Sequence, residues 1–382
     1  MGLWHSLIPY QLWLWFLGLM VPILRGILVV QQISASVWEL DELPNAEEDL
    51  VPQSMAGPNL LGTALLTSKM NSECVATCLI QNGCNDISAS LNLHDCDPRP
   101  FTRGGFGVVY RGYLKDGRPI AIKCIQSFDD PIINLSEHGK NLKRAAREIY
   151  TWSGCNHQGV LPLLGFAHFQ GYIALITPWM SAGPLSQHIK PGSFKLPPLR
   201  TCIQLAMAVE YLHTKGIVHG DIKPDNILVT DQGQVQLADF GSAISTLATA
   251  LNFTRTNSFN FTTRFAAPEV LKGDDHTFTK ESDIYALGMT IFNIMTGRAP
   301  FADKREVSVI IEVVSNKGQP SKSNFEGSLT GSDAKVKMWD LLKGCFDYEP
   351  KNRPRVGQVK EVLIEVERLN DKPCGQVGTA QS

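Results

Sequence analysis

VHGDIKPDNILV, residues Val218–Val229, places an aspartate, a lysine and an asparagine within six residues, between two apolar flanks. Asp221 can accept the proton of an attacking hydroxyl, and Lys223 can neutralise charge on a transferring phosphoryl group. Asn226 offers an oxygen ligand to Mg²⁺. The spacing of these three side chains therefore indicates a loop that supports phosphoryl transfer.

A second acidic motif, LADFGSA, contains Asp239, thirteen residues after Asn226. A carboxylate at this point can bridge phosphate oxygens through a metal ion, so Asp239 is the second candidate magnesium ligand. Phosphoryl transfer depends mostly on positioning and charge neutralisation, which acids and amides at fixed spacing provide. Each residue alone could be an ordinary turn residue, but the ordered set predicts an active site.

A glycine-rich stretch, FTRGGFGVVYRGYLKDGRPIAIKCI, spans Phe101–Ile125. Its glycines, Gly104–Gly107, lie between segments of strand composition, and Asp116-Gly117 is a strong hairpin signal. In a Walker loop or a dinucleotide-binding fingerprint, the glycines instead lead from a strand into a helix. Glycines between antiparallel strands favour a lid over a nucleotide, with Lys123 on the third strand directed toward its phosphates.

The stretch LKRAAREIYTW, Leu142–Trp152, has apolar residues at helical spacing and is predicted to be a helix. Glu148 lies on it, 25 residues after Lys123. A lone lysine and a lone glutamate usually form a solvated surface pair. Within this ordered set, they predict an ion pair that holds Lys123 in place.

Three further motifs complete the series: AAPE ending at Glu269, SDIYALG containing Asp283 and NRP containing Arg353. From residue 97 to residue 370 the chain resembles the eukaryotic protein kinases. The resemblance predicts the α+β, bilobal protein kinase fold, with a small β-rich N-lobe, one regulatory helix and a larger, mainly helical C-lobe. It implies transfer of the γ-phosphate of ATP to hydroxyl groups of protein substrates, with ATP and Mg²⁺ as cofactors.

The resemblance also assigns roles to individual residues. The catalytic residues would be Asp221, Lys223, Lys123 and Glu148, and the metal ligands Asn226 and Asp239. The residues it places around the nucleotide are Thr102, Gly104, Gly105, Phe106, Gly107, Val109, Ala121, Lys123, Thr177, Trp179, Met180 and Leu228. Within that set Thr177 would be the gatekeeper, and the backbone of Trp179 and Met180 would hydrogen-bond to adenine. Val109, Ala121 and Leu228 would enclose the adenine ring.

Other matching residues would support the fold by resemblance. Glu269 and Arg353 would form a buried ion pair, and Asp283 would cap the backbone of the catalytic loop. His219, Phe240 and Trp152 would stack into a regulatory hydrophobic column.

The choice between serine/threonine and tyrosine substrates depends on mixed signals. Lys223 and Thr262 resemble serine/threonine kinases, whereas RFAAPE, LLGF and GPL resemble tyrosine kinases. This mixture resembles the tyrosine-kinase-like branch, whose members mostly phosphorylate serine or threonine. The alternatives are a dual-specificity or tyrosine kinase, a small-molecule kinase, and a pseudokinase scaffold that binds nucleotide and partners without phosphoryl transfer.

Two positions depart from the family pattern. Thr102 replaces the first glycine of the nucleotide loop, and its β-branched side chain stiffens the turn. Gly220 stands before Asp221, where many kinases carry an arginine whose charge is commonly answered by a phosphate in the activation loop. Our hypothesis is that activity does not strictly depend on phosphorylation of that loop.

Composition excludes some classes of function. The chain has 382 residues, 43% of them hydrophobic, and a formal net charge of -2, so nothing in its charge suggests nucleic acid as a partner. Nine cysteines are too few for a disulfide scaffold of this length. Four of them (Cys74, Cys78, Cys84 and Cys96) cluster, without the CxxC spacing of a zinc knuckle, and we interpret them as free cytosolic thiols. The predicted location of the kinase domain is cytoplasmic.

Residues 1–30 form an apolar N-terminal segment, and the first firm charge is Arg25. The segment is marginally long enough to span a bilayer, which would anchor the chain to a membrane. A cleaved signal peptide, N-myristoylation at Gly2 and a later start at Met55 or Met70 are open alternatives.

Three further segments are predicted outside the kinase domain. Residues 31–66 read as an acidic flexible linker, and 371–382 as a disordered tail. Residues 67–96 read as a short helical extension, in which two helices form and Val75, Cys78 and Leu79 share one face.

Overall fold

The computed structural model describes residues 70–104, 107–125, 135–189, 196–245, 262–273, 278–322 and 329–371. All of them belong to one compact unit, residues 62–382. The predictions for residues 1–30, 31–66 and 372–382 lie outside the described residues, as do Gly105 and Phe106 of the nucleotide loop.

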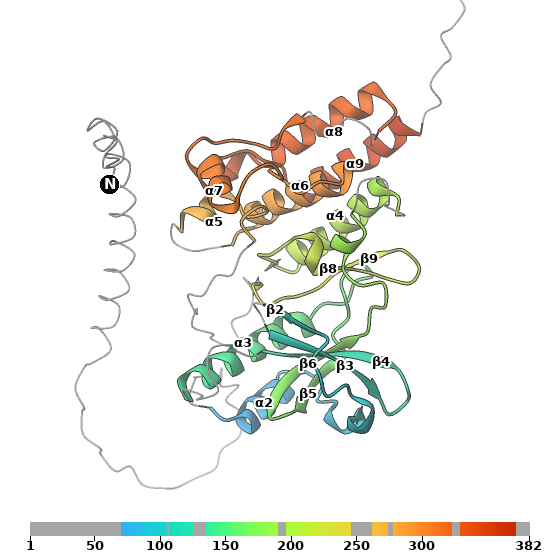
Figure 1. Cartoon of the computed structure of the whole chain (residues 1–382), viewed down its shortest axis with the longest axis vertical. Coiled ribbons are helices and arrows are strands. Elements are labelled where there is room, and N and C mark those ends of the chain that lie inside the picture. The colour runs from blue at the N-terminus through green and yellow to red at the C-terminus, as the bar shows by residue number, and fades with distance from the viewer. Residues whose placement is uncertain are drawn as a thin grey trace, which may run out of the picture. The chain divides into compact units, whose positions relative to one another are not determined.

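The small lobe is built on a six-stranded antiparallel sheet in the order β1-β3-β4-β6-β5, with β2 paired to β3 (Figure 1). The strands are β1 Leu91–Asn92, β2 Thr102–Gly104, β3 Gly107–Leu114, β4 Pro119–Cys124, β5 Gly165–Phe169 and β6 Tyr172–Pro178. The predicted arrangement of glycines between antiparallel strands is confirmed, because Gly104 at the end of β2 pairs with Gly107 at the start of β3.

Residue alternation along β4 divides its side chains between the core and the opposite face. Ile120, Ile122 and Cys124 are fully buried in the sheet core, while Ala121 and Lys123 point to the other face. The predicted helix is also present, as α3 Leu135–Ser153. Its buried positions include the apolar residues Leu142, Ile149 and Trp152, but also Glu148, whose exposed fraction is 1%. A buried carboxylate requires a partner, and this partner is described below.

The N-terminal extension differs in part from its prediction. One helix, α2 Ser72–Gln81, forms and buries Val75, Cys78 and Leu79 as expected, packed beside α3. The expected second helix is absent from this described stretch, which instead has 3₁₀ turns at Ser88–Ser90 and Leu93–Asp95 on either side of β1. Asp86 explains the first turn, because its carboxylate accepts hydrogen bonds from the amide and hydroxyl of Ser88 at 2.9 and 2.6 Å. The domain boundary at residue 97 stays a prediction.

The large lobe is mainly helical (Figure 1). Its helices are α4 Pro198–Thr214, α5 Pro268–Lys272, α6 Lys280–Thr296, α7 Glu306–Val314, α8 Ser332–Cys345 and α9 Val356–Asn370. Two short two-stranded sheets lie on its side next to the sheet lobe: β7 Ile217–Val218 with β10 Ile244–Ser245, and the hairpin of β8 Ile227–Val229 with β9 Val235–Leu237. The α+β, two-lobed fold is therefore confirmed.

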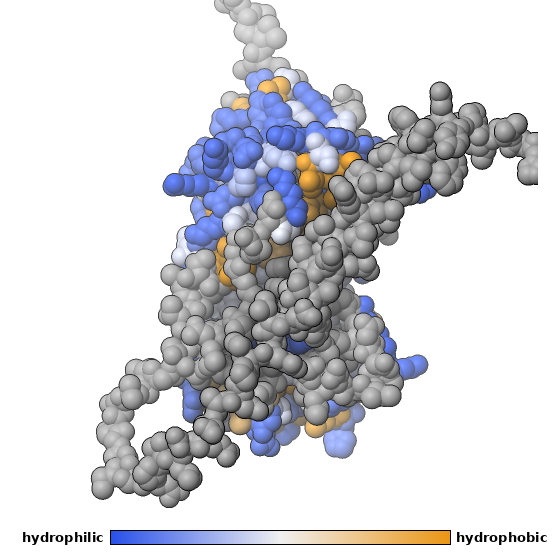
Figure 2. All heavy atoms as spheres, turned by 90° about the vertical axis from the view of Figure 1, so that its left-hand side faces the viewer, coloured by the Kyte–Doolittle hydropathy of each residue, from blue (hydrophilic) through white to orange (hydrophobic). Residues whose placement is uncertain are grey.

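Helix α6 is the central element of the large lobe, since all but three of its residues are buried. A capping box between Thr279 and Ser282 begins it, and Gly297 in the left-handed conformation ends it. Helix α7 is different, because its apolar residues Val307 and Ile311 are 71% and 53% exposed. Figure 2, which faces the side where α7 lies in Figure 1, shows hydrophobic patches among hydrophilic atoms in the upper lobe.

Two sequence interpretations concern features outside the fold itself. Of the helices in the described part of the chain, none combines the length and hydropathy needed to cross a membrane. Cys74, Cys78, Cys84 and Cys96 are all free thiols, as interpreted from their spacing. No group of three or more histidine, cysteine or acidic side chains able to hold a metal occurs among the described residues.

Candidate active site

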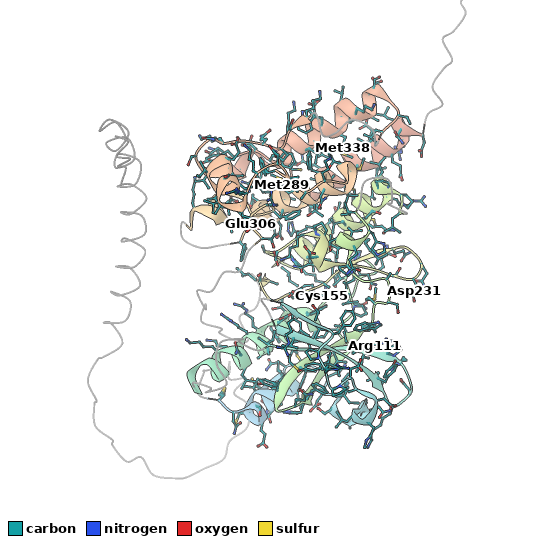
Figure 3. All side chains as sticks on the ribbon, in the orientation of Figure 1. Arg111, Cys155, Asp231, Met289, Glu306 and Met338 are labelled. Atoms are coloured by element: carbon teal, nitrogen blue, oxygen red, sulfur yellow. The ribbon has the colours of Figure 1, made fainter. Side chains whose placement is uncertain are left out.

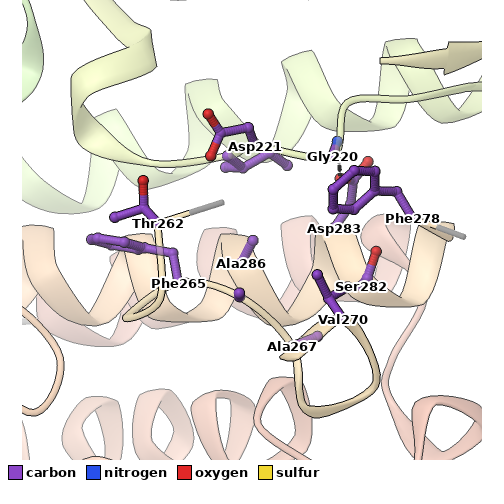
Figure 4. Close-up of a pocket in the computed structure, with 12 residues that line it drawn as sticks. Gly220, Asp221, Thr262, Phe265, Ala267, Val270, Phe278, Ser282, Asp283 and Ala286 are labelled. Carbon is purple, nitrogen blue, oxygen red and sulfur yellow. Dashed lines mark hydrogen bonds between the residues drawn. The ribbon is translucent and has the colours of Figure 1, made fainter. Parts of the chain in front are cut away.

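The loop after β7 brings a carboxylate, an ammonium and a hydroxyl into one short chain of hydrogen bonds. Lys223 Nζ donates to Asp221 Oδ2 and to Thr262 Oγ1, each at 2.7 Å. Lys223 and Thr262 are 39 positions apart in sequence, yet their polar atoms meet beside the catalytic loop. Figure 4 shows Asp221 and Thr262 on the two neighbouring segments. Burial raises the pKa of Asp221, and the neighbouring Lys223 ammonium only partly opposes this shift. Asp221 is thus a carboxylate suited to accept a proton.

Asn226 is oriented by its own loop. Its Nδ2 donates to both the backbone oxygen and Oδ2 of Asp221, each at 2.8 Å. Because the amide nitrogen donates both hydrogen bonds, Asn226 Oδ1 remains available to bind a cation. This orientation is consistent with the predicted role of Asn226 as a magnesium ligand.

Asp239 and Glu148 hold Lys123 between them. Lys123 Nζ lies 2.7 Å from Asp239 Oδ1 and 2.8 Å from Glu148 Oε1. Burial alone would lower the pKa of Lys123, but the two carboxylates outweigh it, so the pKa is raised and the ammonium persists. Glu148 therefore has the partner that its burial requires, and the predicted ion pair is present.

The geometry of Asp239 leaves room for a metal ion. Its Oδ1 accepts from Lys123 and from the Gly241 N–H, at 2.7 and 3.2 Å, and no described residue bonds to Oδ2. Burial alone would raise the pKa of Asp239, but the Lys123 ammonium and these hydrogen bonds lower it, so the side chain stays anionic. One free carboxylate oxygen and one free amide oxygen fit Mg²⁺, which takes few protein ligands and completes its shell with phosphate oxygens and water.

Asp283 on α6 fixes the backbone of the catalytic loop through hydrogen bonds. Its Oδ2 accepts from the His219 N–H and its Oδ1 from the Gly220 N–H, both at 2.8 Å. Asp283 Oδ2 also contacts His213 Nε2 at 2.9 Å, a contact that no motif predicted. The capping role expected of Asp283 is therefore observed, and it ties the loop to the most buried helix of the lobe.

Two long-range contacts expected from the resemblance are also present. Trp152 stacks on Phe240 with ring centroids 4.9 Å apart, and His219 meets Phe240 edge-on at 5.3 Å. In the large lobe, Arg353 forms a bidentate pair with Glu269 at 2.7 and 2.8 Å. The stack joins α3 to the catalytic loop, and the ion pair joins α5 to the segment before α9.

The strand register brings together the residues predicted to enclose a nucleotide. Val109 lies opposite Lys123, and Ala121 lies opposite Thr177. Gly107 must be glycine, because a Cβ atom there would lie 2.2 Å from the Cys124 carbonyl oxygen. Leu228, on the large lobe, is half-buried and bridged to Pro184. Thr102 is exposed on β2, opposite Val109.

One part of the nucleotide prediction needs refinement. The Trp179 N–H donates to the Pro119 carbonyl at 3.1 Å, so it is already used within the sheet. Of the two predicted backbone donors, Met180 N–H is the one with no partner among the described residues. The Trp179 ring instead packs against Phe101, 4.7 Å away, and under Arg111 of β3, which Figure 3 labels in the small lobe. Phe101 was absent from the predicted site because no motif marks it.

Comparison with known proteins agrees with this geometry. The family model for the protein kinase domain matches residues 100–363. The chain belongs to the protein kinase family. MAP3K epsilon protein kinase 1 of Arabidopsis thaliana is 29% identical over 259 residues, 66% of the kinase chain and 17% of that protein.

Two further relatives are similar over two thirds or more of the chain. Mitogen-activated protein kinase kinase kinase 2 of Arabidopsis thaliana is 29% identical over 263 residues, 67% of this chain and 38% of that protein. Mitogen-activated protein kinase kinase kinase A of Dictyostelium discoideum is 29% identical over 286 residues, 74% of this chain and 29% of that protein. The chain thus spans less than two fifths of the length of these relatives.

Proposed function

We propose that the chain is an active protein serine/threonine kinase of the tyrosine-kinase-like branch, which transfers the γ-phosphate of Mg-ATP to proteins in a signalling role. The observation that carries this proposal is the Asp221–Lys223–Thr262 chain of hydrogen bonds beside the Lys123–Glu148 pair. Pseudokinases usually lack one of the groups at Lys123, Asp221 or Asp239, whereas this chain has all three in contact with a partner. The names of the relatives, MAP3K among them, support a signalling role.

Each residue contributes positioning or charge. Asp221 orients the attacking hydroxyl and takes its proton, and Lys223 neutralises charge on the phosphoryl group. Lys123, held by Glu148, binds the phosphates of ATP, while Asn226 and Asp239 would hold Mg²⁺. The ion supplies neutralisation of the charge that develops on the phosphate oxygens. Met180 would orient adenine through its backbone N–H, and Thr177 would line the back of that pocket.

Thr262 supports the preference for serine and threonine. Its hydroxyl is 2.7 Å from Lys223 Nζ, and the backbone after Thr262 leads into α5. This hydrogen bond therefore ties the catalytic loop to the segment that precedes α5. A substrate whose backbone lies along this segment would come close to Asp221. Such a position suits a short side chain such as serine, whose hydroxyl must reach Asp221. This geometry is the support we find for Ser/Thr over Tyr.

The experiment that tests the function is transfer of labelled γ-phosphate from Mg-ATP to a generic basic protein, followed by phosphoamino-acid analysis. The full chain is expected to label serine or threonine, and Asp239→Asn serves as the blank. Label on tyrosine alone would overturn the substrate preference. ATP binding without any transfer would overturn the proposal in favour of a scaffold.

Phosphorylation of the activation loop is expected to be dispensable. Gly220 supplies no cation to bind a loop phosphate, so the double variant Ser258→Ala/Thr263→Ala should keep its rate within about threefold of wild type. The measurement is the initial rate of peptide phosphorylation, with phosphatase-treated wild type as the matched control. Complete loss of activity in Ser258→Ala alone would contradict this prediction.

A further inference from the structure

The backbone that follows Phe240 is held by a side chain that no motif marks. Arg147 donates from Nη2 to the Gly241 carbonyl at 3.1 Å. Arg147 is the residue before Glu148 on α3, so one turn of this helix holds both Lys123 and the backbone after Phe240. The two segments are 94 residues apart in sequence.

The next peptide unit, at Ser242, lies beside Gly220. Gly220 has a φ of +78°, and a Cβ atom built on it would lie 2.9 Å from Cγ and Cδ2 of Phe278 and 3.0 Å from the Ser242 oxygen. The Phe278 ring therefore occupies the place that a side chain at position 220 would need. Figure 4 shows the ring of Phe278 directly against Gly220, above Ser282 and Val270.

The cavity beside this contact is small. The cavity that Gly220, Phe278 and Asp283 line measures about 20 Å³, which is about the volume needed for a single water. An arginine here would also have to adopt a left-handed backbone conformation, which side chains with a Cβ adopt rarely. The position of the Phe278 ring therefore requires glycine at position 220.

The rest of the segment is fixed at both ends. At its start, Asp239 pairs with Lys123 at 2.7 Å. At its end, Ile244 pairs with Val218 in the two-stranded β7–β10 sheet. Residues 241 and 242 lie between these two anchors. Arg147 contacts the carbonyl of residue 241, and Gly220, with the Phe278 ring against it, lies beside residue 242.

We propose that Arg147 and Phe278 form a clasp, defined as these two side chains, that holds residues 241 and 242 in the arrangement needed for catalysis: Arg147 acts directly on Gly241, and Phe278 acts through its packing against Gly220. The clasp takes the place of an arginine at position 220 and its loop phosphate. Both side chains are positioning residues, because each acts through the backbone that it contacts. The proposal deepens the kinase function proposed above, but its central measurement does not require phosphoryl transfer.

Hydrogen exchange in the full-length protein tests the clasp directly. Amides that lose a fixed environment exchange faster, and the segment contains protected amides such as Ala243 N–H, which donates to Phe240 O at 3.0 Å. Arg147→Ala and Phe278→Ala are each expected to speed exchange in residues 239–245 by about tenfold. Arg144→Ala, a change to another arginine on the same helix, is the matched control and should leave the rate unchanged.

Two further variants keep the test decisive. Phe278→Leu retains an apolar side chain, so it should fold even where Phe278→Ala does not, and should show a smaller increase in exchange. Arg147→Lys keeps a charge and a donor, so it should restore part of the protection. Exchange equal to wild type in Arg147→Ala and in the folded Phe278 variant would overturn the clasp, as would an equal increase in Arg144→Ala.

Turnover gives a second readout. Loss of the clasp lowers the fraction of molecules in the catalytic arrangement, so kcat should fall about tenfold while KM for the protein substrate stays constant. A rise in KM with unchanged kcat would contradict a positioning role. If the wild-type chain transferred no phosphate, the proposed function would fail, and the exchange rates would still decide whether the clasp exists.

Discussion

Asp239→Asn is expected to reduce phosphoryl transfer by at least about 10³-fold while the protein remains folded. Asparagine has nearly the same shape as aspartate, so it fits the space beside Lys123 and Gly241. It lacks the negative charge that opposes the Lys123 ammonium and would attract Mg²⁺. Because the pKa of Asp239 is lowered, this charge is present at every pH near neutrality, and its removal affects the whole physiological range.

The measurement for Asp239→Asn combines transfer rate, nucleotide affinity and thermal stability. Asp231→Asn is the matched control, since Asp231 is an exposed aspartate in the β8–β9 turn (Figure 3). We expect binding of ATP without metal to be kept and its strengthening by Mg²⁺ to be lost. Transfer within tenfold of wild type would show that Asp239 is not a metal ligand that the reaction needs.

The same lowered pKa has a consequence for stability against pH. A carboxylate with a depressed folded-state pKa stabilises the native state above the unfolded-state pKa, and this contribution is lost as pH falls through the folded-state value. Asp239 thus contributes to the stability of wild type at neutral pH and ceases to do so only in strong acid. Asp221 has a raised pKa, so its bound proton stabilises the native state at acid pH. This contribution is lost as pH rises through the folded-state value.

Arg353→Met should destabilise the large lobe by about 3–5 kcal/mol. The Arg353 side chain is fully buried, and besides Glu269 it donates to the carbonyl oxygens of Asp347 and Glu281, each at 2.9 Å. Methionine would fill much of the space, but it would leave the Glu269 carboxylate and these two carbonyl groups without a donor. For a domain of this size the melting temperature should fall on the order of 10 °C.

Thermal unfolding checks this second prediction. Lys351→Met is the matched control, because Lys351 is exposed two residues earlier and should change the melting temperature little. The double variant Glu269→Gln/Arg353→Met removes the stranded charge, so it should recover part of the loss. A decrease below about 1 kcal/mol in Arg353→Met would mean that the pair contributes no more than a surface ion pair.

Much of the fold and site could be predicted because the relevant patterns are local. Alternating strand residues place Lys123 on the face of β4 opposite the core, and helical spacing places Glu148 on α3. Asn226 hydrogen-bonds to Asp221 within a stretch of six residues. Because this contact is local, the spacing of the residues was enough to predict the chemistry of the loop. Asp86 shows the limit of this approach, since its short-range turn chemistry replaced a helix predicted from apolar periodicity.

Turn chemistry and residue periodicity act over a few residues, so the order of amino acids is enough to predict the local elements and the groups they present. Which distant groups meet depends on how the folded chain packs. Arg147 reaches Gly241 across 94 residues, Phe278 fills the space beside Gly220, and Trp179 uses its N–H within the sheet. No short pattern encodes these contacts, because each depends on the close packing of segments that are far apart in the chain.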